Sequence, residues 1–383
     1  NNVFVSDIFT NGNAVVALTN NGKIISWGSS SKGGRIDSNT KTLLNNKTVI
    51  KVYYNKYSFA VKTNDNNIYT WGYEFRGGKT NIYDKDNNII QNNIDTTNIK
   101  EIISSDTAYT AIKNDNTIVT WGNSSGGGNL TTPISNVFSV KSTSKAFTAI
   151  YNYENNVGNI ISWGDPTYGG DVMLSAESTK SYYNELISEK KFNKIYFNKY
   201  SFSVINIDNR VFTWGYPKGG GYVSTRSRMS LISGVVKIIS SDNAFCAIKN
   251  DNSIVTWGQS DKGGKLGSIY RWTKNESLGK FMYTLDRIYS NEQLKLLSSG
   301  IVLVKGCNFG FTAIKKEGDN YYIISWGQEK SGGDFNLNNN VPTNIEWTNN
   351  LLIKSETYNV GESIYLNVED NNSNLNSNIS TII

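Results

Sequence analysis

Histidine is absent from the 383 residues of this chain, and its absence excludes several kinds of catalytic and metal site. An imidazole is the general base of Ser-His-Asp triads and the commonest protein ligand of zinc, copper and non-haem iron. Carboxylates are present, but no pair of them recurs with a spacing that indicates a glycosidase. The sequence therefore predicts a non-enzymatic protein with no catalytic residues, no cofactor and no metal site.

Cysteine is scarce as well, because the chain has only two, which cannot form a disulfide framework. Cys246 occupies a repeat position that Thr, Ser, Ala or Val fills elsewhere, and this predicts a small core residue. Cys307 stands where other repeats carry Ser or Asn, so we expect no reactive role for it.

Long apolar runs are also missing. No stretch approaches 18 apolar residues, so no membrane insertion is expected. Residues 1–11 lack the charged start and apolar core of a signal peptide. Because the chain begins at Asn1 rather than Met, the sequence leaves an upstream targeting segment, and with it the compartment, open.

Charge of one sign is not concentrated anywhere in the chain. Thirty-eight Lys and Arg residues against 32 Asp and Glu residues give a net charge of +6. This mild excess is spread along the sequence, as on the mixed surface of a soluble protein, and is not gathered into basic blocks. Nucleic acid is therefore not expected to be a partner.

A repeat built on the dipeptide Trp-Gly organises the chain, with a Gly-Gly pair six and seven residues after each tryptophan. Each tryptophan closes a short strand of two apolar residues followed by Ser or Thr, such as IISW or IVTW. Both side-chain parities of that strand are largely apolar, which indicates burial on both faces. Each tryptophan is thus expected to bury on the order of 200 Å² between neighbouring sheets. The seven structural-repeat residues are Trp27, Trp71, Trp121, Trp163, Trp214, Trp257 and Trp326.

Two more strands precede each Trp strand. The nearer one has a small residue followed in most repeats by an aromatic, as in AYTAI and AFCAI, and its connector to the Trp strand is a cluster such as NDNT or TNNGK. Such clusters of Asn, Asp and Gly tolerate the positive φ of tight hairpins. The farther strand begins with an apolar residue that lies 22 positions before the tryptophan in five repeats. These first residues are Val5, Val49, Ile99, Val137, Phe192, Val235 and Ile301.

One repeat is therefore an antiparallel meander of three or four strands. A sheet that is apolar on both faces needs a neighbour on each side, and radial closure meets this need while leaving only short edges. The predicted fold is all-β, a seven-bladed β-propeller over residues 1–340 with one repeat per blade. Residues 341–383 leave the pattern and are expected to form a closing strand, a linker or a tail. Insertions near 176–192 and 267–298 leave room for short helices.

These repeats resemble those of the propeller family named for the regulator of chromosome condensation, which includes bacterial β-lactamase-inhibitor propellers. TIVTWGNSSGGG and SIVTWGQSDKGG fit the family pattern of an aliphatic strand that ends in Trp-Gly with a glycine about six residues later. The chain departs from the family in having no Gly-x-His after the first strand, and Gly-Gly replaces the usual Gly-Gln-Leu-Gly. The resemblance therefore implies the fold and a role as an interaction scaffold, without the founding member's nucleotide-exchange or chromatin roles.

Binding residues on a repeat scaffold are expected where the sequence varies while the frame stays fixed. The four residues between Trp-Gly and Gly-Gly vary in this way, as SSSK, YEFR and DPTY illustrate. All seven of these linkers are expected to emerge on one face, and aromatic residues and Arg are typical of binding hot spots. The candidate partner-binding residues are Tyr73, Phe75, Arg76, Tyr168, Tyr216, Lys218 and Lys262.

The function that follows is protein–protein interaction through this loop face, with a partner whose identity the sequence does not give. Two alternatives stay open. Propellers with Trp and Tyr in repeated pockets can bind glycans as lectins do. A structural role in a larger assembly, such as a particle coat or a surface layer, is the other.

Overall fold

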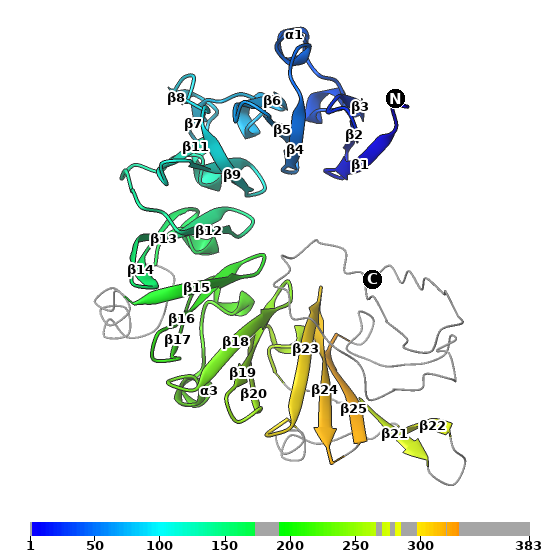
Figure 1. The fold of residues 1–383 in the computed structure, drawn as a ribbon. Coiled ribbons are helices and arrows are strands. Elements are labelled where there is room, and N and C mark those ends of the chain that lie inside the picture. Colours follow the sequence, from blue (N-terminus) through cyan, green and yellow to red (C-terminus); the bar gives the residue numbers. More distant parts are fainter. Residues whose placement is uncertain are drawn as a thin grey trace. The chain divides into compact units, whose positions relative to one another are not determined.

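The computed structural model describes residues 2–172, 191–265, 270–275, 280–284, 297–318 and 320–328. Strands dominate these residues, and they form several antiparallel sheets (Figure 1). The predicted extension at 341–383 and almost all of the 176–192 insertion lie outside the described residues. Every helix in the described part of the chain is too short or too polar to cross a membrane.

The chain divides into two units, and the larger one comprises Asn1–Trp272 and Thr284–Phe335. The smaller one comprises Thr273–Tyr283 and Asn336–Ile383. The described part of the 267–298 insertion, for which the sequence leaves room for a short helix, holds the strands β21 (Tyr270–Asn275) and β22 (Lys280–Thr284). The segments YRWTKN and KFMYT are rich in aromatic residues, which favour strands over helices.

Each of the seven Trp-Gly repeats forms a meander of three antiparallel strands within the larger unit. The first strands are β1 (Val5–Thr10), β4 (Val49–Tyr54), β9 (Ile99–Ser104), β12 (Ser139–Ser142), β15 (Phe192–Phe197), β18 (Val235–Ser240) and β23 (Ile301–Cys307). The second strands are β2 (Ala14–Thr19), β5 (Ser58–Thr63), β10 (Ala108–Lys113), β13 (Ala146–Glu154), β16 (Ser201–Asn206), β19 (Ala244–Lys249) and β24 (Gly310–Glu317). The third strands, which carry the tryptophans, are β3 (Ile24–Gly28), β6 (Ile68–Gly72), β11 (Ile118–Asn123), β14 (Val157–Gly164), β17 (Val211–Gly215), β20 (Ile254–Gly258) and β25 (Asn320–Gly327).

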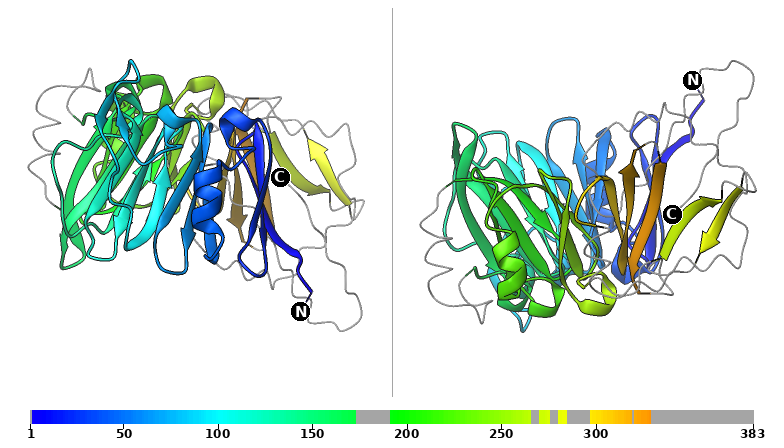
Figure 2. Two further views of the ribbon diagram at one scale, coloured as in Figure 1. Left: turned by 90° about the horizontal axis from the view of Figure 1, so that it is seen from above. Right: turned by 90° about the horizontal axis from the view of Figure 1, so that it is seen from below.

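Short elements lie between the repeats. The α-helix α1 (Ser38–Leu44) joins the first repeat to the second, and α3 (Thr225–Ser230) joins the fifth to the sixth. Between the second and third repeats, β7 (Ile82–Tyr83) pairs with β8 (Ile89–Gln91) and lies parallel to β11. Each first strand contacts the first strand of the next repeat, so successive sheets lie side by side, as both views of Figure 2 show.

The hairpins between second and third strands have the turn chemistry that the sequence predicts. Asn66, Asn116, Asn209 and Asn252 occupy equivalent turn positions and have positive φ values of 59° to 61°. Asparagine tolerates this left-handed conformation better than most residues. The predicted tight turns are therefore confirmed at these four hairpins.

One of these turns provides a pH-dependent prediction. Asp65 accepts hydrogen bonds from the Lys47 ammonium and the Thr63 hydroxyl, and these lower its carboxyl pKa to about 2. The pKa of Asp65 is therefore lower in the folded chain than in the unfolded chain, where it is about 4. The contribution of these hydrogen bonds to the free energy of unfolding is fully present above that pH and is lost as the pH falls through about 2. An NMR titration of the Asp65 carboxyl should show this low midpoint. In Lys47→Ala the midpoint should move up toward 4, and an unchanged midpoint would contradict the assignment.

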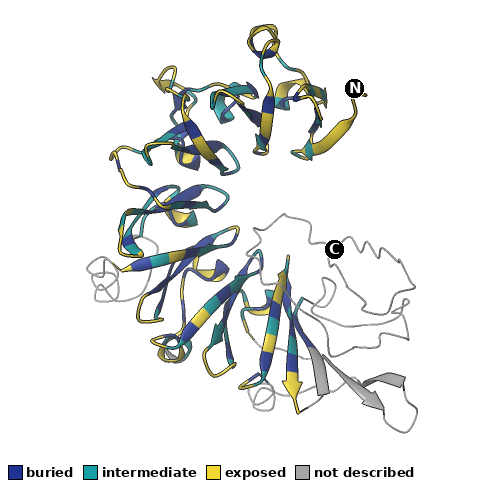
Figure 3. Cartoon of the chain, viewed as in Figure 1, coloured by how far each residue is buried: buried dark blue, intermediate teal, exposed yellow. Residues whose placement is uncertain are grey.

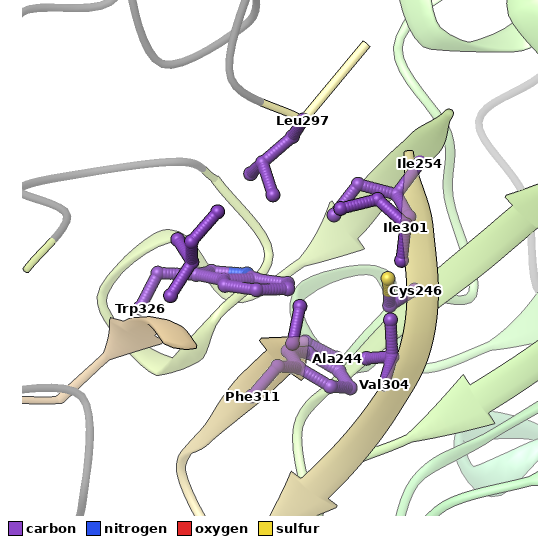
Figure 4. Close-up of a cluster of buried hydrophobic side chains, with 10 residues drawn as sticks. Ala244, Cys246, Ile254, Leu297, Ile301, Val304, Phe311 and Trp326 are labelled. Atoms are coloured by element: carbon purple, nitrogen blue, oxygen red, sulfur yellow. The ribbon is translucent and has the colours of Figure 1, made fainter. Parts of the chain in front are cut away.

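The hydrophobic core lies between successive sheets. The cluster between the sixth and seventh repeats joins Ala244 and Cys246 of β19 to Val304 of β23, Phe311 of β24 and Trp326 of β25 (Figure 4). The predicted core position of Cys246 is confirmed, since its side chain is fully buried and burial raises the pKa of its thiol. Equivalent clusters join each earlier pair of consecutive repeats.

The tryptophans have one repeated environment. Trp214 lies opposite Phe202 on the neighbouring strand, and the two rings stack with centroids 5.6 Å apart. The Trp214 Nε1 donates a hydrogen bond of 3.1 Å to the carbonyl oxygen of Gly169, the first glycine of the preceding repeat's Gly-Gly pair. The same bond is made by Trp71, Trp163, Trp257 and Trp326.

Two tryptophans differ. Trp121 is fully buried, but its Nε1 has no partner among the described residues, and the hydroxyl of its stacking partner Tyr109 instead donates to the Ser58 carbonyl oxygen. Trp27 is 47% exposed, contrary to the burial expected for every repeat tryptophan. Each buried tryptophan packs on the preceding repeat, and no described repeat comes before that of Trp27. The edge strand β1 of the same sheet is likewise exposed over most of its length (Figure 3).

Candidate functional site

The linkers between Trp-Gly and Gly-Gly form single 3₁₀ turns. Each described turn ends at the first glycine of the pair, which is in the left-handed conformation with φ between 91° and 99°. The variable residues thus stand on short, defined turns. The seventh linker lies outside the described ranges except for its first residue. The turns are η1 (Ser30–Lys32), η2 (Glu74–Arg76), η3 (Ser124–Gly126), η4 (Pro166–Tyr168), η5 (Pro217–Gly219) and η6 (Ser260–Lys262).

A repeated hydrogen bond ties each linker to the hairpin turn between the first and second strands of the same repeat. The backbone N–H of Tyr73 donates to the carbonyl oxygen of Tyr57 at 2.9 Å, and that of Tyr216 donates to Tyr200 at 3.1 Å. The bond recurs in all seven repeats. The residue just before the second strand is therefore held beside the first residue of the linker.

The second repeat uses this arrangement to build a first aromatic cluster, which we define as Tyr57, Tyr73 and Phe75. The Tyr73 ring lies 6.2 Å from Tyr57 and 5.6 Å from Phe75 between centroids. Phe75 in turn packs edge-on against Tyr83, which is fully buried and whose hydroxyl donates to Glu74. Tyr73 is 39% exposed, so the cluster presents an aromatic surface to solvent.

The fourth and fifth repeats build a second cluster, the tyrosine row, which we define as Tyr168, Tyr200 and Tyr216. Tyr200 lies in the middle, with its ring centroid 5.7 Å from Tyr168 and 5.9 Å from Tyr216. The Lys145 ammonium lies 4.7 Å from the Tyr168 centroid, and the Lys199 ammonium lies 5.6 Å from that of Tyr200. The row therefore combines aromatic rings with cations.

A third site joins the sixth repeat to the seventh. The Lys262 ammonium lies 4.2 Å from the centroid of Phe309, which occupies the hairpin position that Tyr57 and Tyr200 hold elsewhere. Nearby, burial raises the pKa of the Asp242 carboxyl, against the opposing influence of the Lys199 and Lys262 charges.

The structure brings five of the seven predicted residues into these clusters. Arg76 and Lys218 are the other two, and neither cation lies over an aromatic ring of the described residues. The Arg76 side chain is half-buried, while its carbonyl oxygen accepts from the Asn55 amide and the Ser58 hydroxyl. Lys218 is exposed on η5.

Five residues of these sites were missed by the sequence analysis. Tyr57, Lys145, Tyr200 and Phe309 all precede the small residue of a second strand, and Lys199 comes directly before Tyr200. The common position of the first four is visible in the sequence, but its proximity to the linker depends on the repeated backbone hydrogen bond.

The chemistry of this surface suits binding. Within the described ranges, no three Cys, Asp or Glu side chains gather in a way that could hold a metal ion. Tyr and Phe rings offer apolar contact area, and the cations beside them add electrostatic attraction.

No family model matches the chain, and no curated protein matches it. Among solved structures, the chain is similar to Prp20p from Saccharomyces cerevisiae, with 14% identity, a TM-score of 0.40 and coverage of 83% of this chain and 81% of that one. It is also similar to yeast RCC1 (Prp20) in a structure with Kap60, with 13% identity, a TM-score of 0.41 and coverage of 86% and 80%. Human WBSCR16 shows 12% identity, a TM-score of 0.40 and coverage of 85% and 87%. Similarities this weak assign neither a ligand nor a partner to this chain.

Proposed function

We propose that this chain is a non-enzymatic scaffold that closes into a seven-bladed β-propeller and binds another protein through its linker face. The linker face is defined as the 3₁₀ turns together with the hairpin turns to which they are hydrogen-bonded. The observation that carries the proposal is the gathering of exposed and half-buried aromatic residues and lysines on these turns, in part from consecutive repeats.

Closure of the ring is supported by the interface that recurs between consecutive repeats, in which a tryptophan packs on the preceding repeat. Trp27 has the same place in its repeat as Trp71 and Trp214, yet it is the one repeat tryptophan that is largely exposed. The seventh repeat carries its own Gly-Gly pair at 332–333, six residues after Trp326. In a closed ring that repeat would precede the first and supply the missing partner for Trp27, hiding both apolar faces.

A protein partner is supported by the composition of the linker face. Aromatic residues are enriched at the centres of protein interfaces because they bury much area at little cost in conformational entropy. Tyr73 and Tyr216 are 39% and 36% exposed, so much of each ring is available for contact.

Affinity capture with the intact chain and a four-alanine variant at Tyr73, Phe75, Tyr168 and Tyr216 tests the proposal. The variant should lose most of the partner that the intact chain recovers, because truncating a few hot-spot residues removes most of the binding energy. A control variant carries alanine at two other exposed side chains, Leu43 of α1 and Met229 of α3, and should keep the partner. Recovery of the same partner by the intact chain and the four-alanine variant would refute the role of this face.

A further inference from the structure

Resting on the proposed function, we infer that the tyrosine row binds an extended acidic segment of the partner protein. The row lies on η4, η5 and the hairpin turn before β16, so it crosses from the fourth repeat to the fifth. It combines three successive aromatic rings with lysines, and each feature constrains the ligand.

The spacing of the rings favours an extended chain. Neighbouring centroids in the row are 5.7 and 5.9 Å apart. Alternate residues of an extended strand lie about 6.6 Å apart and point to the same side. A peptide lying along the row would therefore place successive same-side residues near successive tyrosines, as in other recognition of extended peptides.

The charges favour an acidic ligand and disfavour a basic one. Lys145 and Lys199 already lie over the faces of Tyr168 and Tyr200, so the ring faces attract the chain's own cations. A ligand cation would meet these ammonium groups and be repelled, whereas a carboxylate would be attracted by the same groups. Lys218, which is exposed on η5 two residues after Tyr216 in the same linker, adds a third positive charge.

Two carboxylates lie near these lysines, and neither neutralises the row. Asp165 is 3.8 Å from the Lys145 ammonium, and its carboxylate also accepts the Thr167 backbone N–H. Asp242 is partly buried in the turn of another repeat. In the described part of the chain, the carboxylates beside Lys145 and Lys199 are therefore already engaged or partly withdrawn from solvent.

The row is also held in place before a ligand arrives. Tyr200 is fixed by its carbonyl, which accepts from the Tyr216 N–H at 3.1 Å. The Asn198 amide donates to the carbonyl of Gly219 at 2.7 Å, which ties the hairpin turn to η5. The Lys199 carbonyl accepts from Ser144 of the preceding repeat at 3.0 Å. Such preorganisation lowers the entropy lost on binding.

The first aromatic cluster offers a matched comparison. There the rings pack edge-on toward the buried Tyr83, and Glu74 lies between Tyr83 and Lys79, where it forms an ion pair of 3.1 Å. A carboxylate thus stands beside that cluster, and one ammonium, that of Lys32, lies 5.3 Å from the Tyr57 centroid, whereas two ammonium groups lie over rings of the tyrosine row. The first cluster is therefore less suited to an acidic ligand than the tyrosine row.

Fluorescence anisotropy on the full chain tests the inference with labelled short peptides of alternating Glu and Leu, Gln and Leu, or Lys and Leu. The Glu peptide should bind at least about tenfold more tightly than the other two. A variant with Lys145→Gln, Lys199→Gln and Lys218→Gln should lose that preference, and it keeps the three tyrosines that pack on the fold. The variant Leu43→Ala with Met229→Ala, which changes two exposed side chains outside the linker face, serves as the control and should bind the Glu peptide as the intact chain does.

Several results would overturn the inference. These are equal binding of the Glu and Gln peptides, unchanged binding by the triple Lys→Gln variant, or no binding of any peptide. Tighter binding of a single-stranded oligonucleotide or a sulfated oligosaccharide than of the Glu peptide would also overturn it, because the row would then serve another class of anion. None of these results depends on the capture experiment, so loss of the captured partner without Glu-peptide binding would reject this inference and leave the proposed function standing.

Discussion

Replacing Trp214 by alanine should lower the free energy of unfolding by about 3–5 kcal/mol. The indole is fully buried, stacks on Phe202 and donates to the Gly169 carbonyl of the preceding repeat, so the substitution removes a core side chain and leaves a buried acceptor without its partner. Urea unfolding followed by circular dichroism would measure the loss. Trp214→Phe keeps a stacking ring and should cost less, about 1–2 kcal/mol. Equal losses for the two variants would contradict this account.

The matched substitution at Trp27 tests the proposed ring. In a closed propeller Trp27 would be covered by the seventh repeat, and Trp27→Ala should then cost more than about 2 kcal/mol, approaching the effect at Trp214. If the face of the first repeat stays in solvent, where Trp27 is 47% exposed, the loss should stay below about 1 kcal/mol. The small loss would refute closure, and a crystal structure of the intact chain would settle the number of sheets.

The parts of the fold that the sequence predicted are those in which the signal is local. The short apolar strand that ends in each tryptophan and the Asn-rich connector after each second strand lie within about a dozen residues of each other, so strand positions and positive-φ turns follow directly. Cys246 was placed in the core because the residues at the same position of the other repeats, Thr, Ser, Ala or Val, show what fits there.

Only some residues of the candidate site could be predicted from the sequence, because the site depends on contacts between segments that are not adjacent in sequence. Tyr200 precedes a strand and Tyr216 follows the next one, and only the repeated hydrogen bond between their backbones brings the rings together. One sequence signal existed, since KVYYNKYSF in the second repeat returns as KIYFNKYSF in the fifth and places Tyr57 and Tyr200 at the same position. Periodicity alone does not show that this position faces the linker.

The predictions that fell short share a different cause. The exposure of Trp27 depends on which sheet precedes it, and no property of its own repeat carries that information. The strand β21 forms by pairing with β25, which lies about 50 residues farther along the chain, so its conformation is set by a distant partner.

Gly169→Ala should lower the free energy of unfolding by about 2–5 kcal/mol, from left-handed backbone strain and overpacking together. Gly169 has φ +92°, and an added Cβ would lie 2.7 Å from Cδ2 of the buried Phe202 ring. Neither group can move freely, because Phe202 stacks on Trp214 and the Gly169 carbonyl accepts the Trp214 Nε1 hydrogen. Thermal and urea unfolding of the variant would measure the loss.

Gly12→Ala separates the two causes of that loss. Gly12 also has a positive φ, +83°, but an added Cβ there would meet no atom within 4 Å. This variant should therefore show the backbone strain alone, about 1–2 kcal/mol. The loss of unfolding free energy at Gly169 minus that at Gly12 measures how tightly a linker glycine is packed between consecutive repeats. Equal losses at the two glycines would mean that the interface adjusts to the extra methyl group. Because the same glycine ends the 3₁₀ turn that carries Tyr168, a tight interface is also what would hold the tyrosine row in position.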